Sequence, residues 1–188
     1  MKKLMIGCCI FCFVAVQVSA QIPTFTKGDN LASIAIGPFS GSFSNGNNWS
    51  STPYFTGYFE TCILDNLFDE KSSLGVGGVL GYKQTKYEIT SGGSSWGWRY
   101  TYFLFGARGA LHYAFVDKLD TYAGVMVGFR LSSSKEIGTS TVKPEKYNGA
   151  TSDLFVGARY YFTNNFGVFA ELGYSWFSYL NLGVTIKF

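Results

Sequence analysis

The chain has 188 residues, of which 19% are aromatic and only 14% are charged, and its formal net charge is +3. An ordinary soluble domain carries about 25% charged residues, so this composition argues against a typical water-exposed surface. The small net charge also argues against the broad basic field of a nucleic-acid-binding protein, and we expect no nucleic-acid partner.

The first twenty residues have the order of a secretory signal peptide. Two lysines near the start are followed by an apolar run over residues 4–16, and small residues come next. This order predicts export and cleavage near Ala20–Gln21. We therefore expect a signal peptide over residues 1–20 and a single domain over residues 21–188. That domain keeps Cys62 as its only cysteine, so it cannot form an intrachain disulfide.

Eight segments of the mature chain alternate between apolar and polar residues. They cover residues 31–41, 54–64, 74–84, 99–115, 121–131, 152–162, 166–175 and 179–188. Most are close to the 9–11 residues of a tilted membrane strand, and no later apolar run approaches the length of a spanning helix. Lipid offers no partner to open strand edges. The pattern therefore predicts an all-β fold: an eight-stranded antiparallel up-and-down transmembrane β-barrel.

The connectors between these segments alternate in length. Long polar connectors cover residues 42–53, 85–98 and 132–150, whereas the connectors after the second, fourth and sixth segments are short. Outer-membrane barrels have long loops outside the cell and short turns in the periplasm. We expect the same arrangement here, with a tight final connector over residues 176–178 and both chain ends on the periplasmic side.

Each segment has one apolar face and one face rich in glycine with about one charge. A glycine-rich face is poorly suited to bulk water, so we expect the apolar face to lie in lipid. A soluble, lipocalin-like barrel with an apolar interior is the alternative. Aromatic residues at the segment ends are expected to form two interfacial girdles. The girdle residues are Phe55, Trp96, Trp98, Tyr174 and Trp176 at the loop end and Tyr113, Phe115, Tyr160, Phe162, Phe166 and Phe188 at the turn end.

The signal peptide, the eight segments and the terminal Phe188 together resemble a small outer-membrane β-barrel of the OmpA-like, OmpX-like or OmpW-like kind. The resemblance implies an outer-membrane location and contact with outer-membrane lipid and lipopolysaccharide. It also implies that the barrel-assembly machinery reads the last strand, and we expect a monomer. The residues of that assembly signal are Leu180, Leu182, Val184, Ile186 and Phe188.

The inward face carries charged residues that can form a network in the lumen. These are Glu60, Lys83, Arg108, Arg130, Arg159 and Glu171, with Lys187 on the same face. An eight-stranded barrel leaves room only for side chains, and buried charges are costly unless they are paired. We expect Arg159 beside Glu171, and Glu60 paired with Arg108 or Lys83. This predicts a structural or porin-like protein with a plugged lumen; a narrow gated pore is the alternative.

Two other functions are weighed. His112 is the only histidine, and no serine or acid has a spacing that places it beside His112. We therefore expect no enzyme, catalytic residue, cofactor or metal, and an enzyme acting on lipid A is the weaker alternative.

The main alternative is surface adhesion or recognition through the long loops, which carry Trp49, Trp96 and Tyr147 among small polar residues.

Overall fold

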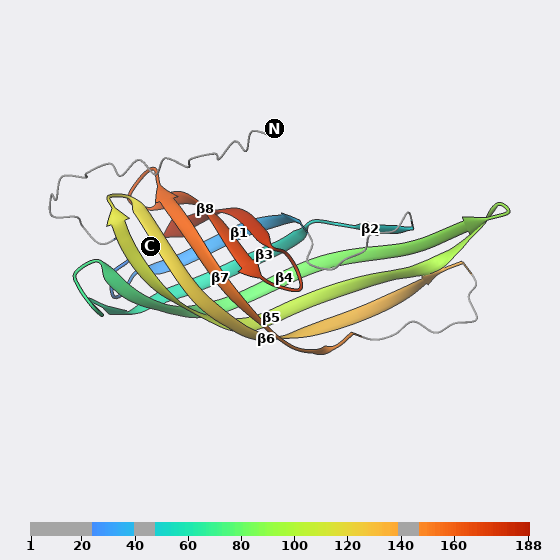
Figure 1. Cartoon of the computed structure of the whole chain (residues 1–188), viewed down its shortest axis with the longest axis horizontal. Helices are drawn as coiled ribbons and strands as arrows, with labels where there is room; N and C mark the ends of the chain where they lie inside the picture. Colours follow the sequence, from blue (N-terminus) through green and yellow to red (C-terminus); the bar gives the residue numbers. More distant parts are fainter. Residues whose placement is uncertain (1–23, 40–47, 139–146) are drawn as a thin grey trace, which may run out of the picture.

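The computed structural model describes residues 24–39, 48–138 and 147–188, and in these ranges every regular element is an antiparallel strand. The strands are β1 (Asn30–Phe39), β2 (Trp49–Ser51), β3 (Tyr54–Asp65), β4 (Ser72–Ser91), β5 (Ser94–Val116), β6 (Leu119–Ile137), β7 (Gly149–Tyr161), β8 (Phe166–Tyr174) and β9 (Leu180–Lys187) (Figure 1). Within those ranges no helix is long and apolar enough to cross a membrane. The predicted signal peptide lies outside the described residues.

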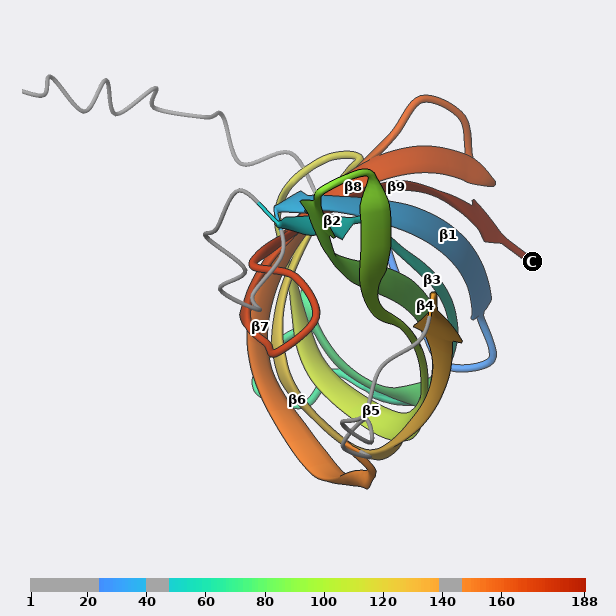
Figure 2. The same cartoon turned by 90° about the vertical axis from the view of Figure 1, so that its right-hand side faces the viewer.

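The strands close into a ring of eight. Strand β1 pairs with β9, with Leu31 opposite Lys187, and β4 pairs with β5 along its full length. Strands β2 and β3 follow one another along the same edge of β4 and therefore occupy one position in the ring. Figure 2 shows the curved wall from the end of the long strands. The predicted antiparallel barrel is confirmed, and its closure pairs the edges of the first and last strands.

The outward face of the barrel is apolar and the inward face is polar. Ile34 and Leu80 are 67% and 69% exposed, whereas Lys83 and Asp120 are completely buried. A water-soluble protein shows the reverse distribution, so the exposed apolar belt fits a hydrocarbon surrounding. The predicted outward direction of alternate residues in β9 is confirmed, and the soluble, lipocalin-like alternative is wrong.

Strands β4, β5 and β6 are much longer than the sequence predicted. Residues 85–98 were expected to form a polar loop, but β4 and β5 stay paired as far as Ser91 and Ser94. Gly92 and Gly93 both have positive φ, at 59° and 83°, which a two-residue hairpin turn with strand-like twist requires. We call the region that projects beyond the barrel the extension (Figure 1). It consists of β2, of residues 85–99 in the β4–β5 hairpin and of residues 132–137 in β6.

The opposite end of the barrel has short connectors, as expected. Asp117 and Lys118 alone join β5 to β6. In the turn between β3 and β4, Asp69 accepts a hydrogen bond of 2.8 Å from the Tyr113 hydroxyl, and this bond lowers the pKa of Asp69. The backbone N–H of Asn30 donates to the carbonyl of Phe188 at 2.8 Å, so the C-terminus also lies at this turn end.

Three tryptophans do not belong to the predicted lipid-facing girdle. Trp96 and Trp98 occupy even-numbered positions of β5, which turn to the same side as the buried Tyr102 and Arg108. Trp176 lies in the connector between β8 and β9, where its ring contacts that of Tyr102 at 4.9 Å. The other girdle residues keep to the outward face because they follow the alternation of their strands or lie just beyond a strand end.

Candidate functional site

The part of the lumen towards the turn end holds a buried chain of charged side chains. Nε2 of His112 lies 2.7 Å from Oε1 of Glu60, and Nδ1 lies 3.0 Å from both carboxylate oxygens of Asp120. Nη1 of Arg159 donates to Oδ2 of Asp120 at 2.9 Å. At most 3% of each of these four side chains is exposed. Each charge therefore meets a partner instead of water, which buried charges require.

A second ion pair lies beside this chain. Nη2 of Arg108 donates to Oε2 of Glu171 at 2.8 Å, and the hydroxyl of Tyr58 donates to Oε1 of Glu171 at 3.3 Å. The Arg108 guanidinium also lies 4.3 Å from the ring centre of Tyr58 and 4.2 Å from that of Phe155. Such cation–π contacts add to the attraction between the charges, and the two rings fill space next to the guanidinium.

Glycines on the neighbouring strands make room for these long side chains. A Cβ atom at Gly75 would overlap the Glu60 side chain, and one at Gly157 would overlap the ring of Tyr122. Gly157 is also the cross-strand partner of Glu171. The glycines of the inward face therefore leave the space that the long side chains of the lumen occupy.

The hydrogen-bond geometry fixes the charge of this network. Both ring nitrogens of His112 face carboxylate oxygens, which accept hydrogen bonds, so both nitrogens must carry a proton. The imidazolium and the guanidinium groups of Arg108 and Arg159 then balance the three carboxylates. In the described ranges no group of three or more His, Cys, Asp or Glu side chains is arranged to hold a metal ion.

Four of the six predicted lumen residues, Glu60, Arg108, Arg159 and Glu171, form the buried ion pairs, but with different partners. Arg159 binds Asp120 and not Glu171, and Glu60 binds His112 and not Arg108 or Lys83. The prediction that no acid lies beside His112 is wrong. Asp120 is two residues from Tyr122, the direct partner of His112 on β6, and Glu60 reaches His112 over β4, the strand between β3 and β5. The strand-pair register would have revealed the first contact, whereas the second depends on the curvature of the wall.

Lys83 and Arg130 lie at the extension end, away from the ion pairs. Nζ of Lys83 donates to the carbonyl of Phe177 at 3.4 Å. The guanidinium of Arg130 lies 4.1 Å from the ring centre of Trp176, and its Nε donates to the carbonyl of Tyr147 at 2.8 Å. These contacts hold the connector between β8 and β9 over the lumen, where Phe177 is completely buried.

The turn end is covered by residues that precede β1. Phe25 is only 2% exposed, and its ring centre lies 4.7 Å from that of His112. It packs in a cluster with Leu31, Cys62 and Tyr161. Nζ of Lys187 donates to the carbonyl of Thr24 at 3.0 Å and so fixes the segment from the last strand. The sequence alternation gave no signal for this contact, because residues 24–29 form no strand.

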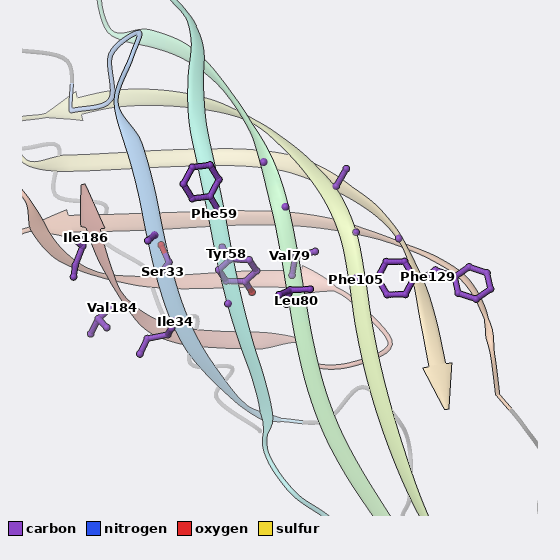
Figure 3. A pocket seen from close by; sticks show the side chains of 17 residues that line it. Ser33, Ile34, Tyr58, Phe59, Val79, Leu80, Phe105, Phe129, Val184 and Ile186 are labelled. Carbon is purple, nitrogen blue, oxygen red and sulfur yellow. The ribbon is translucent and has the colours of Figure 1, made fainter. Parts of the chain in front are cut away.

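The cavity that the described residues form beside the ion pairs is small. A cavity of about 20 Å³ next to Arg108 is lined in part by Asp153, Phe155 and Asn181, which is room for about one water molecule. A broad hollow of about 960 Å³ lies instead on the outward face. Figure 3 shows Phe59, Leu80 and Phe105 standing around it. This hollow is lined mainly by apolar groups of the lipid-facing belt and offers no chemistry beyond contact with hydrocarbon.

Comparison with known proteins identifies the fold. No protein family matches the sequence, and no curated protein does so either. Among solved structures, Ail of Yersinia pestis in complex with the heparin analogue sucrose octasulfate matches with a TM-score of 0.50 and 13% identity, over 87% of this chain and 100% of that chain. The N-terminal β-barrel domain of Pseudomonas aeruginosa OprF matches with a TM-score of 0.45 and 16% identity, over 85% and 97%.

The likeness to Ail shows that the chain has the fold of a small outer-membrane β-barrel. At the level of the fold, the resemblance noted in the sequence is confirmed. The fold and the exposed apolar belt are those of an outer-membrane protein, which is the location that the sequence predicts.

Proposed function

We propose that the chain is a sealed barrel, which anchors the extension outside the membrane and does not conduct solutes. The observation that carries the proposal is the buried network around His112, in which Glu60 and Asp120 bind the two sides of the imidazole. Opening a path through it would separate paired charges in a medium of low dielectric, which is costly. The stacked rings on Arg108 and the small remaining cavity also support a closed lumen.

Planar-bilayer conductance of the refolded protein tests the seal. We expect no steady conductance from the wild type. The double variant Arg108→Ser, Glu171→Ser removes one ion pair and both long side chains together, so it is expected to admit small ions. Leu182→Ala on the lipid-facing side serves as the matched control and is expected to stay silent. Steady conductance by the wild type would contradict the proposal and favour the pore.

We also infer that the barrel is not an enzyme. Both nitrogens of His112 are engaged and Phe25 covers its ring, so no nitrogen is free to act as a general base. Incubation with lipid A and with peptides is expected to give no turnover. Turnover that disappears in His112→Ala would overturn this inference.

A role in recognition at the cell surface is the second candidate, and the extension favours it. Three long strands project past the barrel without adding to the lumen seal (Figure 1). Ail is by name an attachment invasion locus protein, and a related role in attachment is proposed for this chain. Cells that display the barrel are expected to adhere to host-cell surfaces, whereas cells with a β4–β5 hairpin shortened by residues 86–98 are not. Contact with lipopolysaccharide, reading of β9 by the assembly machinery and a monomeric state remain predictions.

A further inference from the structure

One face of the extension carries a cluster of aromatic side chains, which we call the aromatic ladder: Trp49, Tyr87, Trp96 and Trp98. Trp49 on β2, Tyr87 on β4 and Trp98 on β5 are direct cross-strand partners. The ring centres of Trp49 and Tyr87 are 4.7 Å apart. Those of Tyr87 and Trp98 are 6.0 Å apart, with only 10° between the ring planes. The ladder is therefore a row of neighbouring rings across three strands, in which Trp96 meets Trp98 edge-on at 5.6 Å between ring centres.

This surface is only partly covered by the residues that the structure describes. Trp49 is 40% exposed, and Tyr87, Trp96 and Trp98 are half-buried. The ladder lies beyond the apolar belt and on the face that continues the lumen side of the wall, so hydrocarbon does not cover it. An exposed group of large aromatic side chains outside the membrane indicates a surface used for binding.

Charges are concentrated on the opposite face of the same strands. Lys86, Arg99 and Lys135 are direct partners across β4, β5 and β6, and they occupy positions that alternate with those of the ladder. On the ladder face, the next row of residues carries hydroxyl groups: Ser51 donates to Thr85 at 3.0 Å. The ladder face thus offers aromatic rings, hydroxyl groups and the carboxylate of Glu136, the direct partner of Trp98, whereas Lys86, Arg99 and Lys135 are turned away.

We propose that the aromatic ladder binds a neutral oligosaccharide chain, an inference that rests on the proposed recognition role and names its ligand class. Sugar rings have apolar C–H faces, which stack on aromatic rings, and hydroxyl groups at their edges, which form hydrogen bonds. Trp96 and Trp98 are two residues apart on β5, a step of about 7 Å along a strand. The planes of these two rings are 86° apart, so successive sugar rings of an extended chain can contact the face of one ring and the edge of the next.

Two observations distinguish a neutral glycan from a sulfated polysaccharide and from a protein partner. A sulfated polysaccharide needs several cations on the binding face, and the row of Lys86, Arg99 and Lys135 faces the other way. A protein partner would use deep apolar pockets for anchor residues, whereas the apolar hollows of about 960 and 750 Å³ lie on the lipid-facing belt and include no ladder residue. A neutral glycan is the ligand that matches both features.

Binding is tested on the full barrel refolded in a detergent without sugar groups, such as lauryldimethylamine oxide. Maltoheptaose, cellohexaose, chitohexaose and sucrose octasulfate are titrated, and binding is followed by tryptophan fluorescence and saturation-transfer NMR. At least one of the three neutral oligosaccharides is expected to bind. Its affinity is expected to fall by more than about tenfold in Trp98→Ala and in Trp49→Ala. Trp49 lies on a short exposed strand, so its replacement leaves the barrel intact.

Arg99→Ala is the matched control, since Arg99 follows Trp98 in the chain but lies on the opposite face. We expect this variant to bind like the wild type. The proposal is overturned if no neutral oligosaccharide binds at millimolar concentration, if the tryptophan variants bind as well as the wild type, or if only sucrose octasulfate binds and Arg99→Ala abolishes that binding. A further result would be that cells lose adhesion when the hairpin is shortened, while excess oligosaccharide leaves the adhesion of wild-type cells unchanged. That result would overturn the glycan ligand and leave the recognition role in place.

Discussion

His112 on β5 and Asp120 on β6 are joined across one strand pair, with Nδ1 3.0 Å from both carboxylate oxygens. Glu60 binds the other side of the same imidazole. The ring therefore carries a positive charge that two buried carboxylates share. Removing it leaves Glu60 without its ion-pair partner and leaves Asp120 with Arg159 alone.

Replacing His112 by leucine is expected to lower the free energy of unfolding by about 3–5 kcal/mol, because it leaves buried negative charge uncompensated. Urea unfolding of the barrel in lipid vesicles, followed by tryptophan fluorescence, measures the change. Ser33→Ala is the control: it removes a neutral hydrogen bond of 2.8 Å to Thr185 elsewhere in the lumen and should cost about 1 kcal/mol. Equal effects of the two variants would argue against a charged imidazole.

Phe25 is expected to protect Cys62 from water-soluble reagents, because both lie in the same buried cluster at the turn end. In Phe25→Ala the alkylation of Cys62 by a maleimide should become severalfold faster while the barrel stays folded. Phe166→Ala removes an outward aromatic residue at the same end and should leave the rate unchanged. If both variants react at the wild-type rate, Phe25 does not close this end.

Gly183 and Gly57 distinguish the crowded face of the wall from the open one. A Cβ at Gly183 would meet the carbonyl of Ile34 and the ring of Phe169, whereas one at Gly57 lies 3.8 Å from its nearest neighbour. Gly183→Ala should therefore lower the free energy of unfolding by about 1–3 kcal/mol through overpacking. Gly57→Ala should be nearly neutral in the same urea titration. If Gly57→Ala lowered the free energy of unfolding more than Gly183→Ala, the assignment of Gly183 to the packed face would be wrong.

The turn between β3 and β4 provides a prediction that depends on pH. The hydrogen bond from Tyr113 lowers the pKa of Asp69 in the folded barrel, so this bond stabilises the fold when the carboxyl group is charged. The contribution is present above the ordinary carboxyl pKa and disappears as the pH falls through the lowered value. In Tyr113→Phe the pKa of Asp69, measured by carboxyl ¹³C NMR, should rise toward its ordinary range. If the Asp69 carboxyl gave the same titration curve in the wild type and in Tyr113→Phe, the hydrogen bond from Tyr113 would be contradicted.

The fold was predictable because a closed barrel shows the alternation of its strands directly in the sequence. The outward positions of β9, from Leu180 to Phe188, follow from that alternation alone. The length of β4 and β5 was missed because residues 85–98 are rich in serine and glycine. The Gly92–Gly93 pair, flanked by strand-forming residues, was the available signal for a tight hairpin.

The partners in the lumen were less predictable, since they depend on three-dimensional register. Glu60 and His112 are 52 residues apart, and only the tilt and curvature of the strands bring them together over β4, which lies between β3 and β5. Asp120 was assigned to a turn in the sequence, which concealed its inward direction. The contact of Phe25 with His112 has no periodic signal at all, because Phe25 precedes the first strand.

Side-chain NMR of the wild-type barrel in lipid nanodiscs tests the sealed lumen most directly. The Nε–H protons of Arg108 and Arg159 should exchange slowly with water and resist broadening by a water-soluble paramagnetic agent, because both side chains are buried among ion pairs and rings. The exposed Arg99 on the extension should exchange rapidly and broaden. Exchange and broadening of Arg108 and Arg159 at the level of Arg99 would contradict a closed lumen.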